Sequence, residues 1–310
     1  MILPRITSAA LALGLLATPA SADLIYGVKS PSPGVELSMP TSVLFAFSED
    51  SPNGISPIAN VTLDSVGIDV DGLALSRHYG LLGFAMTGNI AAPASALVSI
   101  NPTTGAATLL GSTQTNRNLR GAMFDSADRL WAVDDFARTL LRINPTSGAI
   151  LSEVALTKSG NPINTLPGND LAQAADGTVY LSAYDMDVLP NGAPTLFTLD
   201  LATGIASVAL ADTVSDNEIF GLPLFNSGLA ASTAGHTNRL FALDGDGQDD
   251  IFTYDLPGFA RTETASHILS HFNAGGLDLA SLAPEPVPEP ASLLLLTLAT
   301  AGLAAARRRG

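Results

Sequence analysis

The side chains best placed to do chemistry in this chain are the carboxylates of one short acidic stretch. Asp244–Asp250, with the sequence DGDGQDD, alternates Asp and Gly just before a strand-like apolar run. Calcium prefers six to eight oxygen ligands, and a glycine-rich loop can curl carboxylates around one ion. Asp244, Asp246 and Asp250 would supply carboxylates. Gln248 would add a side-chain or backbone oxygen. The pattern predicts a Ca²⁺ site, with a solvated turn as the alternative.

The same stretch resembles the Asp-rich calcium loops of FG-GAP-type repeats. It departs from them at Ala242, where that family would have another Asp. No Glu follows at the distance that an EF-hand loop requires. The resemblance therefore implies a calcium loop whose ligand set is incomplete.

Two other acidic pairs follow strand-like runs and could serve as a general acid and base. They are Asp134/Asp135 and Asp185/Asp187. Glycoside hydrolysis uses two carboxyl groups roughly 5–10 Å apart, so these pairs would carry an enzymatic activity if they met at that distance. Solvated loop ends are the alternative interpretation.

The four histidines form no recognised metal motif. Glu263, His267 and His271 have the spacing of one helical face, but Thr262 and Ile268 favour a strand or loop there. The sequence contains no GxSxG, P-loop, GxGxxG or HExxH motif. We therefore assign no catalytic residue.

Composition narrows the classes of function further. The chain has 29 acidic and 14 basic residues, a formal net charge of −15, and no cysteine. Nucleic acids and anionic lipids require clusters of Lys and Arg, so this charge argues against both as partners. Without cysteine the chain has no disulfides, thiolate metal sites or Cys nucleophile. The fold must be held by its hydrophobic core.

A phrase of alternating apolar residues, then Asn or Asp, then a closing Gly recurs along the chain. Asn or Asp accepts a turn hydrogen bond, and Gly takes the positive-φ position that closes the turn. Alternation, as in Val98 and Ile100, predicts a strand with one buried face before each turn. The copies are Leu97–Gly105, Leu140–Gly148 and Leu196–Gly204, with looser ones at Leu44–Gly54 and Ile251–Gly258.

Each phrase is the third part of a predicted four-strand unit. A fourth strand follows the closing glycine, as at 106–110 and 205–210. Units of roughly 40–55 residues are typical of propeller blades. First strands are expected at 72–75, 121–124, 170–173 and 228–231, and second strands at 81–85, 130–133, 179–182 and 240–243.

The two ends of the body complement one another. The first unit begins at a second strand, 24–28, while 276–280 looks like a first strand with nothing after it. Pairing them would close a ring without a long open edge. We predict an all-β, five-bladed β-propeller over residues 23–283, with six or seven blades, a β-sandwich or a β-solenoid as alternatives. The repeats resemble quinoprotein-like and NHL-like propellers.

The first 22 residues are typical of a secretory signal peptide. Arg5 gives the basic start, 9–17 the apolar segment, and Ala20-Ser21-Ala22 the small-residue site that signal peptidase prefers. The apolar segment is too short for a stable anchor. We therefore expect an N-terminal signal helix and a mature chain that begins at Asp23.

The last 27 residues, 284–310, combine three features in order. Pro288, Glu289 and Pro290 form a triplet in a proline-rich, extended lead-in. Residues 291–306 carry no charge and are rich in Leu and Ala, which predicts a C-terminal transmembrane helix. Arg307, Arg308 and Arg309 follow at once, and such residues stay on the cytoplasmic side of a membrane.

This order resembles the PEP-CTERM sorting signal of Gram-negative bacteria. The resemblance implies that an exosortase cleaves near the triplet and that the protein passes from an inner-membrane-anchored precursor to the cell surface or biofilm matrix. A simple C-terminal membrane anchor is the alternative. We expect a non-enzymatic structural or interaction module for exopolysaccharide or another matrix protein. An extracellular hydrolase or lyase acting on polysaccharide or a small ester or sugar is the second hypothesis.

Overall fold

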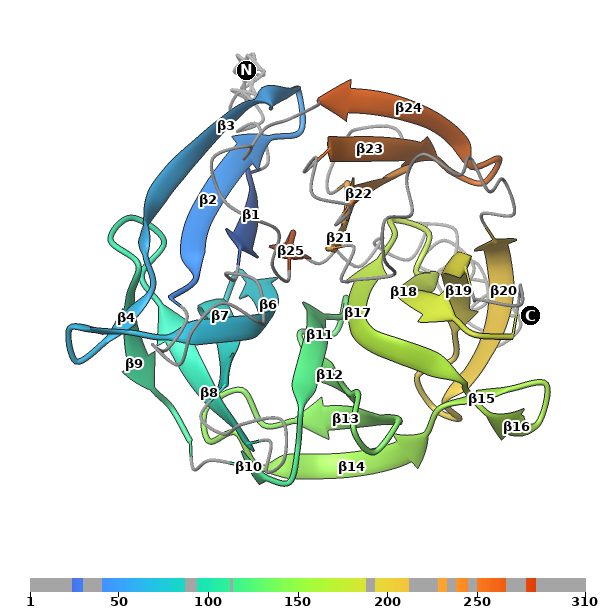
Figure 1. Ribbon diagram of the computed structural model, residues 1–310, viewed down its shortest axis with the longest axis horizontal. Helices are drawn as coiled ribbons and strands as arrows, with labels where there is room; N and C mark the ends of the chain where they lie inside the picture. Colours follow the sequence, from blue (N-terminus) through green and yellow to red (C-terminus); the bar gives the residue numbers. More distant parts are fainter. Residues whose placement is uncertain are drawn as a thin grey trace, which may run out of the picture.

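The structure is a computed structural model of the chain, and it describes nine segments: 24–29, 41–86, 94–111, 114–187, 193–211, 228–232, 238–244, 250–265 and 277–282. Within these segments the strands form five sheets around a common axis (Figure 1). The structure therefore confirms an all-β, propeller-like architecture. The expected signal segment 1–22 and sorting segment 284–310 lie outside the described residues.

Each sheet has four main strands in the same order from the axis outward (Figure 1). The innermost strands are β6 (Asp69–Ser76), β11 (Leu119–Phe124), β17 (Thr165–Gln173), β21 (Leu229–Ala231) and β25 (Leu277–Ala280). The second strands are β7 (Gly80–Met86), β12 (Leu130–Asp134), β18 (Val179–Asp185), β22 (Arg239–Asp244) and β1 (Leu24–Lys29). The third strands are β8 (Ala94–Ile100), β13 (Thr139–Ile143), β19 (Ala193–Leu199), β23 (Asp250–Asp255) and β2 (Val43–Ser48). The outermost strands are β9 (Ala106–Leu109), β14 (Ile150–Ala155), β20 (Ile205–Ala211), β24 (Ala260–Ala265) and β3 (Ser51–Asn60).

Five short strands were not predicted. Two of them join the next sheet at the rim, because β4 pairs in parallel with β9 and β15 pairs in parallel with β20, whereas β10 pairs with β8 of the sheet that the chain is leaving. A chain that leaves one sheet thus adds to the outer edge of the next sheet before it turns inward. The short strands are β4 (Thr62–Leu63), β5 (Val66–Gly67), β10 (Gln114–Thr115), β15 (Thr157–Lys158) and β16 (Asn161–Pro162).

The predicted pairing of the two terminal strands is confirmed. β25 pairs antiparallel with β1, with Ala280 opposite Tyr26 and Leu277 opposite Lys29. Each innermost strand also contacts the next one around the axis, from β6 through β11, β17, β21 and β25 back to β6. The innermost strands therefore form a closed circuit.

The predicted turn chemistry is confirmed at the clear copies of the repeated phrase. The carboxamide oxygen of Asn101 accepts hydrogen bonds from the backbone N–H groups of Thr103 and Thr104. Gly105 closes the turn at a φ of 69°, and Gly148 and Gly204 adopt the same conformation. In each case the Gly N–H donates to the carbonyl of the Asn or Asp that opens the turn.

The two looser copies were assigned the wrong closing residue. Gly54 lies inside β3, because the chain already turns at Glu49 and Asp50. In the last sheet, Phe259 rather than Gly258 has positive φ, at 53°. Spacing to the next glycine is therefore a poor guide to the closing residue, even where an Asp-Leu opening is present, as at Asp255-Leu256.

The core is thicker than one buried face per strand. Val98 and Ile100 are buried as predicted, yet Leu97, whose side chain belongs to the other face of the strand, is also buried. Every residue of β12, including Trp131, is buried. The reason is that each sheet packs between two neighbours, so second and third strands are covered on both faces. Only outermost strands, such as β14, keep a largely exposed pattern.

Candidate functional site

The structure brings two of the four predicted calcium ligands to the base of one hairpin. Asp244 ends β22, Asp250 begins β23, and the two are register partners. Asp246 and Gln248 lie outside the described residues. Within the described residues, no group of three or more His, Asp or Glu side chains is arranged to hold a metal ion. Calcium binding by this loop stays a prediction.

The other predicted residues are mostly beyond the described part of the chain. This applies to Ala20 and Ala22 of the signal segment, to Pro288, Glu289 and Pro290, and to Arg307, Arg308 and Arg309. It also applies to His236, His267 and His271. His78 is exposed in the predicted turn after β6, where its ring packs edge-on against Tyr79.

Asp134 is held by a cation and by backbone amides at the end of β12. Its side chain is fully buried, and Oδ2 lies 2.9 Å from Nη1 of Arg117. Arg117 also pairs with Glu153 at 2.8 Å, which raises the pKa of Arg117 and lowers that of Glu153. Oδ1 of Asp134 accepts hydrogen bonds from the N–H groups of Asn118, Phe136 and Ala137.

Asp185 has an equivalent arrangement at the end of β18. Nζ of Lys158 lies 2.7 Å from Oδ2 of the buried Asp185 and 2.8 Å from Oδ2 of the exposed Asp187. Burial lowers the pKa of Lys158, but the hydrogen bonds to the two carboxylates outweigh it and the pKa is raised. The hydrogen bond from Lys158 lowers the pKa of Asp187. These acids act as anchors for the loops after the second strands.

A buried charged cluster that the sequence analysis missed lies at the start of three innermost strands. The Arg120 guanidinium on β11 is 3.3 Å from Oδ2 of Asp71 on β6 and 3.6 Å from Oδ2 of Asp135. Asn169 on β17 donates a hydrogen bond to Asp135. Asp71 and Asn169 are each 4% exposed. Two carboxylates, one guanidinium and one amide thus join three consecutive sheets.

The repeat itself contained a signal for this cluster. Asp71, Arg120 and Asn169 each stand directly before the Gly or Asp that opens the first-strand phrase, so they share one position of the repeat. The strands approach closely there. A Cβ on Gly121, whose φ is 45°, would meet the backbone oxygen of Asn169. A polar residue at one repeat position in three consecutive units is therefore directed at the axis.

Asp170 occupies the axis itself. It is 1% exposed, and its Oδ2 atom accepts hydrogen bonds from the backbone N–H of Leu229 at 2.5 Å and of Leu279 at 3.2 Å. Its Oδ1 atom accepts from the N–H of Leu171. Burial raises the pKa of Asp170 well above its ordinary value, although these three amides oppose the change. The carboxyl group thus satisfies donors on the inner edges of β21 and β25, which no further strand covers.

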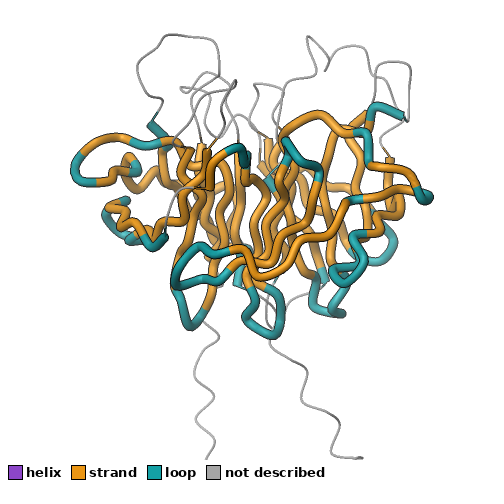
Figure 2. Tube along the Cα trace, turned by 90° about the horizontal axis from the view of Figure 1, so that it is seen from below, coloured by secondary structure: helices purple, strands orange, loops and turns teal. Residues whose placement is uncertain are grey.

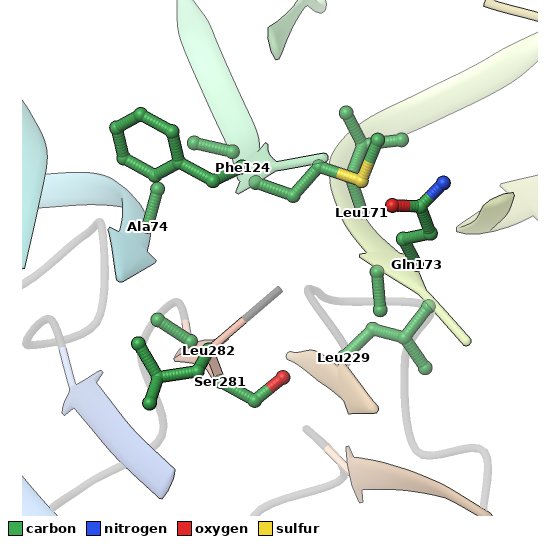
Figure 3. A pocket seen from close by; sticks show the side chains of 11 residues that line it. Ala74, Phe124, Leu171, Gln173, Leu229, Ser281 and Leu282 are labelled. Carbon is green, nitrogen blue, oxygen red and sulfur yellow. The ribbon is translucent and has the colours of Figure 1, made fainter. Parts of the chain in front are cut away.

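The opposite end of the axis is a small hollow lined mainly by apolar side chains (Figure 3). Residues from all five innermost strands surround it, among them Ala74, Phe124, Leu171, Leu229 and Ala280. Gln173 and Ser281 supply its polar side chains. Among the described residues that line this hollow there is no carboxylate.

The described residues contain no helix with the length and apolar character needed to cross a bilayer, and the predicted span 291–306 lies outside them. A comparison with protein families matches residues 286–309 to the PEP-CTERM protein-sorting motif. A comparison with curated proteins found no match.

Among solved structures the chain is similar to glutaminyl cyclase from Myxococcus xanthus, with 18% identity, a TM-score of 0.42, and coverage of 69% of this chain and 79% of that one. It is similar to virginiamycin B lyase from Staphylococcus aureus, with 12% identity, a TM-score of 0.37, and coverage of 76% and 70%. It is also similar to BamB from Moraxella catarrhalis, with 14% identity, a TM-score of 0.33, and coverage of 74% and 62%. The activities that these names state belong to those proteins.

The motif match confirms the sorting signal that was predicted at the C-terminal end. It includes the Pro-Glu-Pro triplet at 288–290 and the three arginines at 307–309. The motif marks an exported precursor that passes through the membrane and is sorted by exosortase to the cell surface. The chain therefore carries a PEP-CTERM sorting motif at residues 286–309, and its body has a propeller-like arrangement of sheets.

Proposed function

We propose that the body of this chain is a non-enzymatic interaction module, released at the cell surface or into the biofilm matrix once exosortase has removed the tail. We count the five sheets as five blades of one propeller, closed by β25 against β1. The signal peptide 1–22 and the tail 284–310 are delivery segments, so the mature protein is close to residues 23–283. Signal peptidase and exosortase act on it in turn.

The observation that carries this proposal is how the carboxylates around the axis are engaged. Asp170 is occupied by three backbone amides, and Asp134 and Asp185 are paired with Arg117 and Lys158. A carboxylate whose oxygen atoms accept several hydrogen bonds is held in one position and has few acceptor sites left for a substrate. These groups are therefore suited to holding strands and loops in place.

The proposed partner is a neutral exopolysaccharide or another matrix protein. The formal charge of −15 would repel anionic polymers over about one Debye length, roughly 8 Å at physiological ionic strength. We further propose that the hairpin loop between Asp244 and Asp250 binds Ca²⁺. Isothermal titration of the secreted protein with CaCl₂ tests that proposal, and an absence of heat at millimolar calcium would remove it.

One experiment separates the module from the alternative hydrolase or lyase. The secreted protein is incubated with polysaccharide purified from the matrix of the same bacterium, and both co-sedimentation and new chain ends are measured. We expect the protein to sediment with the polymer while reducing ends and unsaturated products stay at the level of the buffer control. Product release that increases with protein concentration would contradict the non-enzymatic proposal.

A further inference from the structure

Both ends of the body leave from the same face of the ring. Leu24 pairs with Ser48, next to the turn at Glu49 and Asp50. Leu282 forms a parallel bridge with Leu75, next to the turn after β6. Figure 2 shows the strands side by side in one layer, with described turns along its lower edge. We call the side at which the first and third strands end the tail face.

The second strands end at the opposite face, where the described turn 135–138 follows β12. Asp71 precedes the part of β6 that pairs with the middle of β7, and Asp135 directly follows β12. The charged cluster of Asp71, Arg120, Asp135 and Asn169 therefore lies toward this outer face. The apolar hollow, which Leu282 helps to line, lies toward the tail face.

The distance from the tail face to the sorting motif is short. Eight residues, Ala283–Pro290, separate Leu282 from the uncharged segment 291–306, and fully extended they reach at most about 29 Å. Four of the eight are prolines, which stiffen a linker. The linker also starts near the axis, because β25 is an innermost strand.

This reach is too short for the body to turn over. If the outer face lay on a bilayer, the linker would first have to run outward across the other three strands of its sheet. It would then have to run the length of one strand to the outer face. Three strand spacings are about 14 Å and six residues of strand are about 20 Å, which gives roughly 34 Å before side chains are added. The body can tilt, but it cannot invert.

We propose that the membrane-bound precursor holds its tail face toward the bilayer and presents its outer face away from it. The inference rests on the proposed function through one element, the membrane span at 291–306. It identifies the surface that a matrix partner meets first, and the surface that is close to exosortase before cleavage.

The absence of cysteine makes a direct test possible, because single cysteines can be labelled without background. Ala202→Cys lies in the tail-face turn after β19, and Ala137→Cys lies in the outer-face turn after β12. The two sites are matched, because each alanine is exposed and donates its N–H to the aspartate that opens its turn. Ala127→Cys, in the turn after β11, is a second tail-face site.

Each full-length precursor is made without exosortase, reconstituted in liposomes, and labelled with a donor dye, with an acceptor dye on the lipid headgroups. We expect stronger energy transfer from positions 202 and 127 than from position 137. Inserting ten Gly/Ser residues after Leu282 should reduce this difference, because the reach limit is then removed. Equal transfer, or stronger transfer from position 137, in protein that stays with the membrane would overturn the orientation alone. Recovery of the precursor in the soluble fraction would overturn both the orientation and the membrane span on which it rests.

Discussion

The carboxyl group of Asp170 on β17 accepts a hydrogen bond from the backbone N–H of Leu279 on β25, 109 residues further along the chain. The same oxygen accepts from Leu229 on β21, so one side chain joins the innermost strands of three sheets. Asp170 stands where the equivalent units have Gly72 and Gly121. The axis has room for the Asp170 side chain because the equivalent residues, Gly72 and Gly121, have no side chain.

Removing this carboxyl group should destabilise the ring strongly. Asp170→Ala leaves three buried N–H groups without an acceptor, and each such loss costs roughly 1–3 kcal/mol. We expect a total loss of about 3–5 kcal/mol in the free energy of unfolding, measured by urea denaturation. Asp170→Asn keeps the shape and one acceptor oxygen, so it should lose about 1–2 kcal/mol. An alanine variant within 1 kcal/mol of the natural protein would show that Asp170 does not fasten the ring.

The pH dependence of stability should carry the signature of Asp170. Burial raises its pKa in the folded state above the unfolded value of about 3.9. The folded protein thus binds the proton more tightly, and the contribution is complete below about pH 4 and lost as pH rises through the folded pKa. Relative to Asp170→Asn, the natural protein should therefore lose stability as the pH rises from about 4 toward the folded-state pKa, by up to about 1.4 kcal/mol per pH unit. Glu153 and Asp187, whose pKa values are lowered, act in the opposite direction but equally in both proteins. A difference that grows with pH in favour of the natural protein would contradict the assignment.

Arg120 should matter far more than an exposed arginine with a similar partner. Arg120→Ala leaves the carboxylates of Asp71 and Asp135, at 5% and 1% exposure, without their shared cation. Such a loss costs about 3–5 kcal/mol. Arg239→Ala is the control, because Arg239 and Asp255 are 43% and 54% exposed and their pair contributes less than about 1 kcal/mol. Equal losses in thermal or urea unfolding would mean that the buried cluster is structurally unimportant.

Alanine substitutions at two glycines with positive φ distinguish the effect of a steric clash from the effect of the backbone conformation alone. Gly121→Ala puts alanine in a strained backbone conformation and also places its Cβ against the backbone of Asn169 and Asp170. We therefore expect a loss of about 3 kcal/mol or more in the free energy of unfolding. Gly160→Ala, at a φ of 82° with no atom within 4 Å, should lose only about 1–2 kcal/mol. Their unfolding midpoints in urea provide the comparison. A Gly160 variant as damaged as the Gly121 variant would show that the axis is loosely packed.

The sequence was sufficient for features that depend on neighbouring residues. Alternation at Val98 and Ile100 and the turn chemistry of Asn101 and Gly105 are local, so strand positions and turns could be predicted from them. The pairing of β25 with β1 could be predicted because each end lacked the strand that the other supplied. Because the four-strand unit repeats, the long-range pairing of β25 with β1 could be predicted from the strand that each end was missing.

Other features depend on contacts that no local pattern encodes. The burial of Leu97 and the short pairing of β4 with β9 arise only when one sheet packs against the next. The cluster around Arg120 draws its members from three sheets, so its carboxylates cannot be matched to it by spacing. The sequence shows that Asp71, Arg120 and Asn169 share one position of the repeat. It does not show that their side chains meet between the innermost strands.

The central claim is that this chain is exported and then cut near its Pro-Glu-Pro triplet. The most direct measurement is the intact mass of the protein recovered outside cells with and without exosortase, with Pro288→Ala/Pro290→Ala as a matched variant. We expect an extracellular chain that begins near Asp23 and lacks 291–310, and a cell-associated chain with the complete tail when exosortase or the triplet is absent. Extracellular protein that still carries Arg307, Arg308 and Arg309 would contradict it.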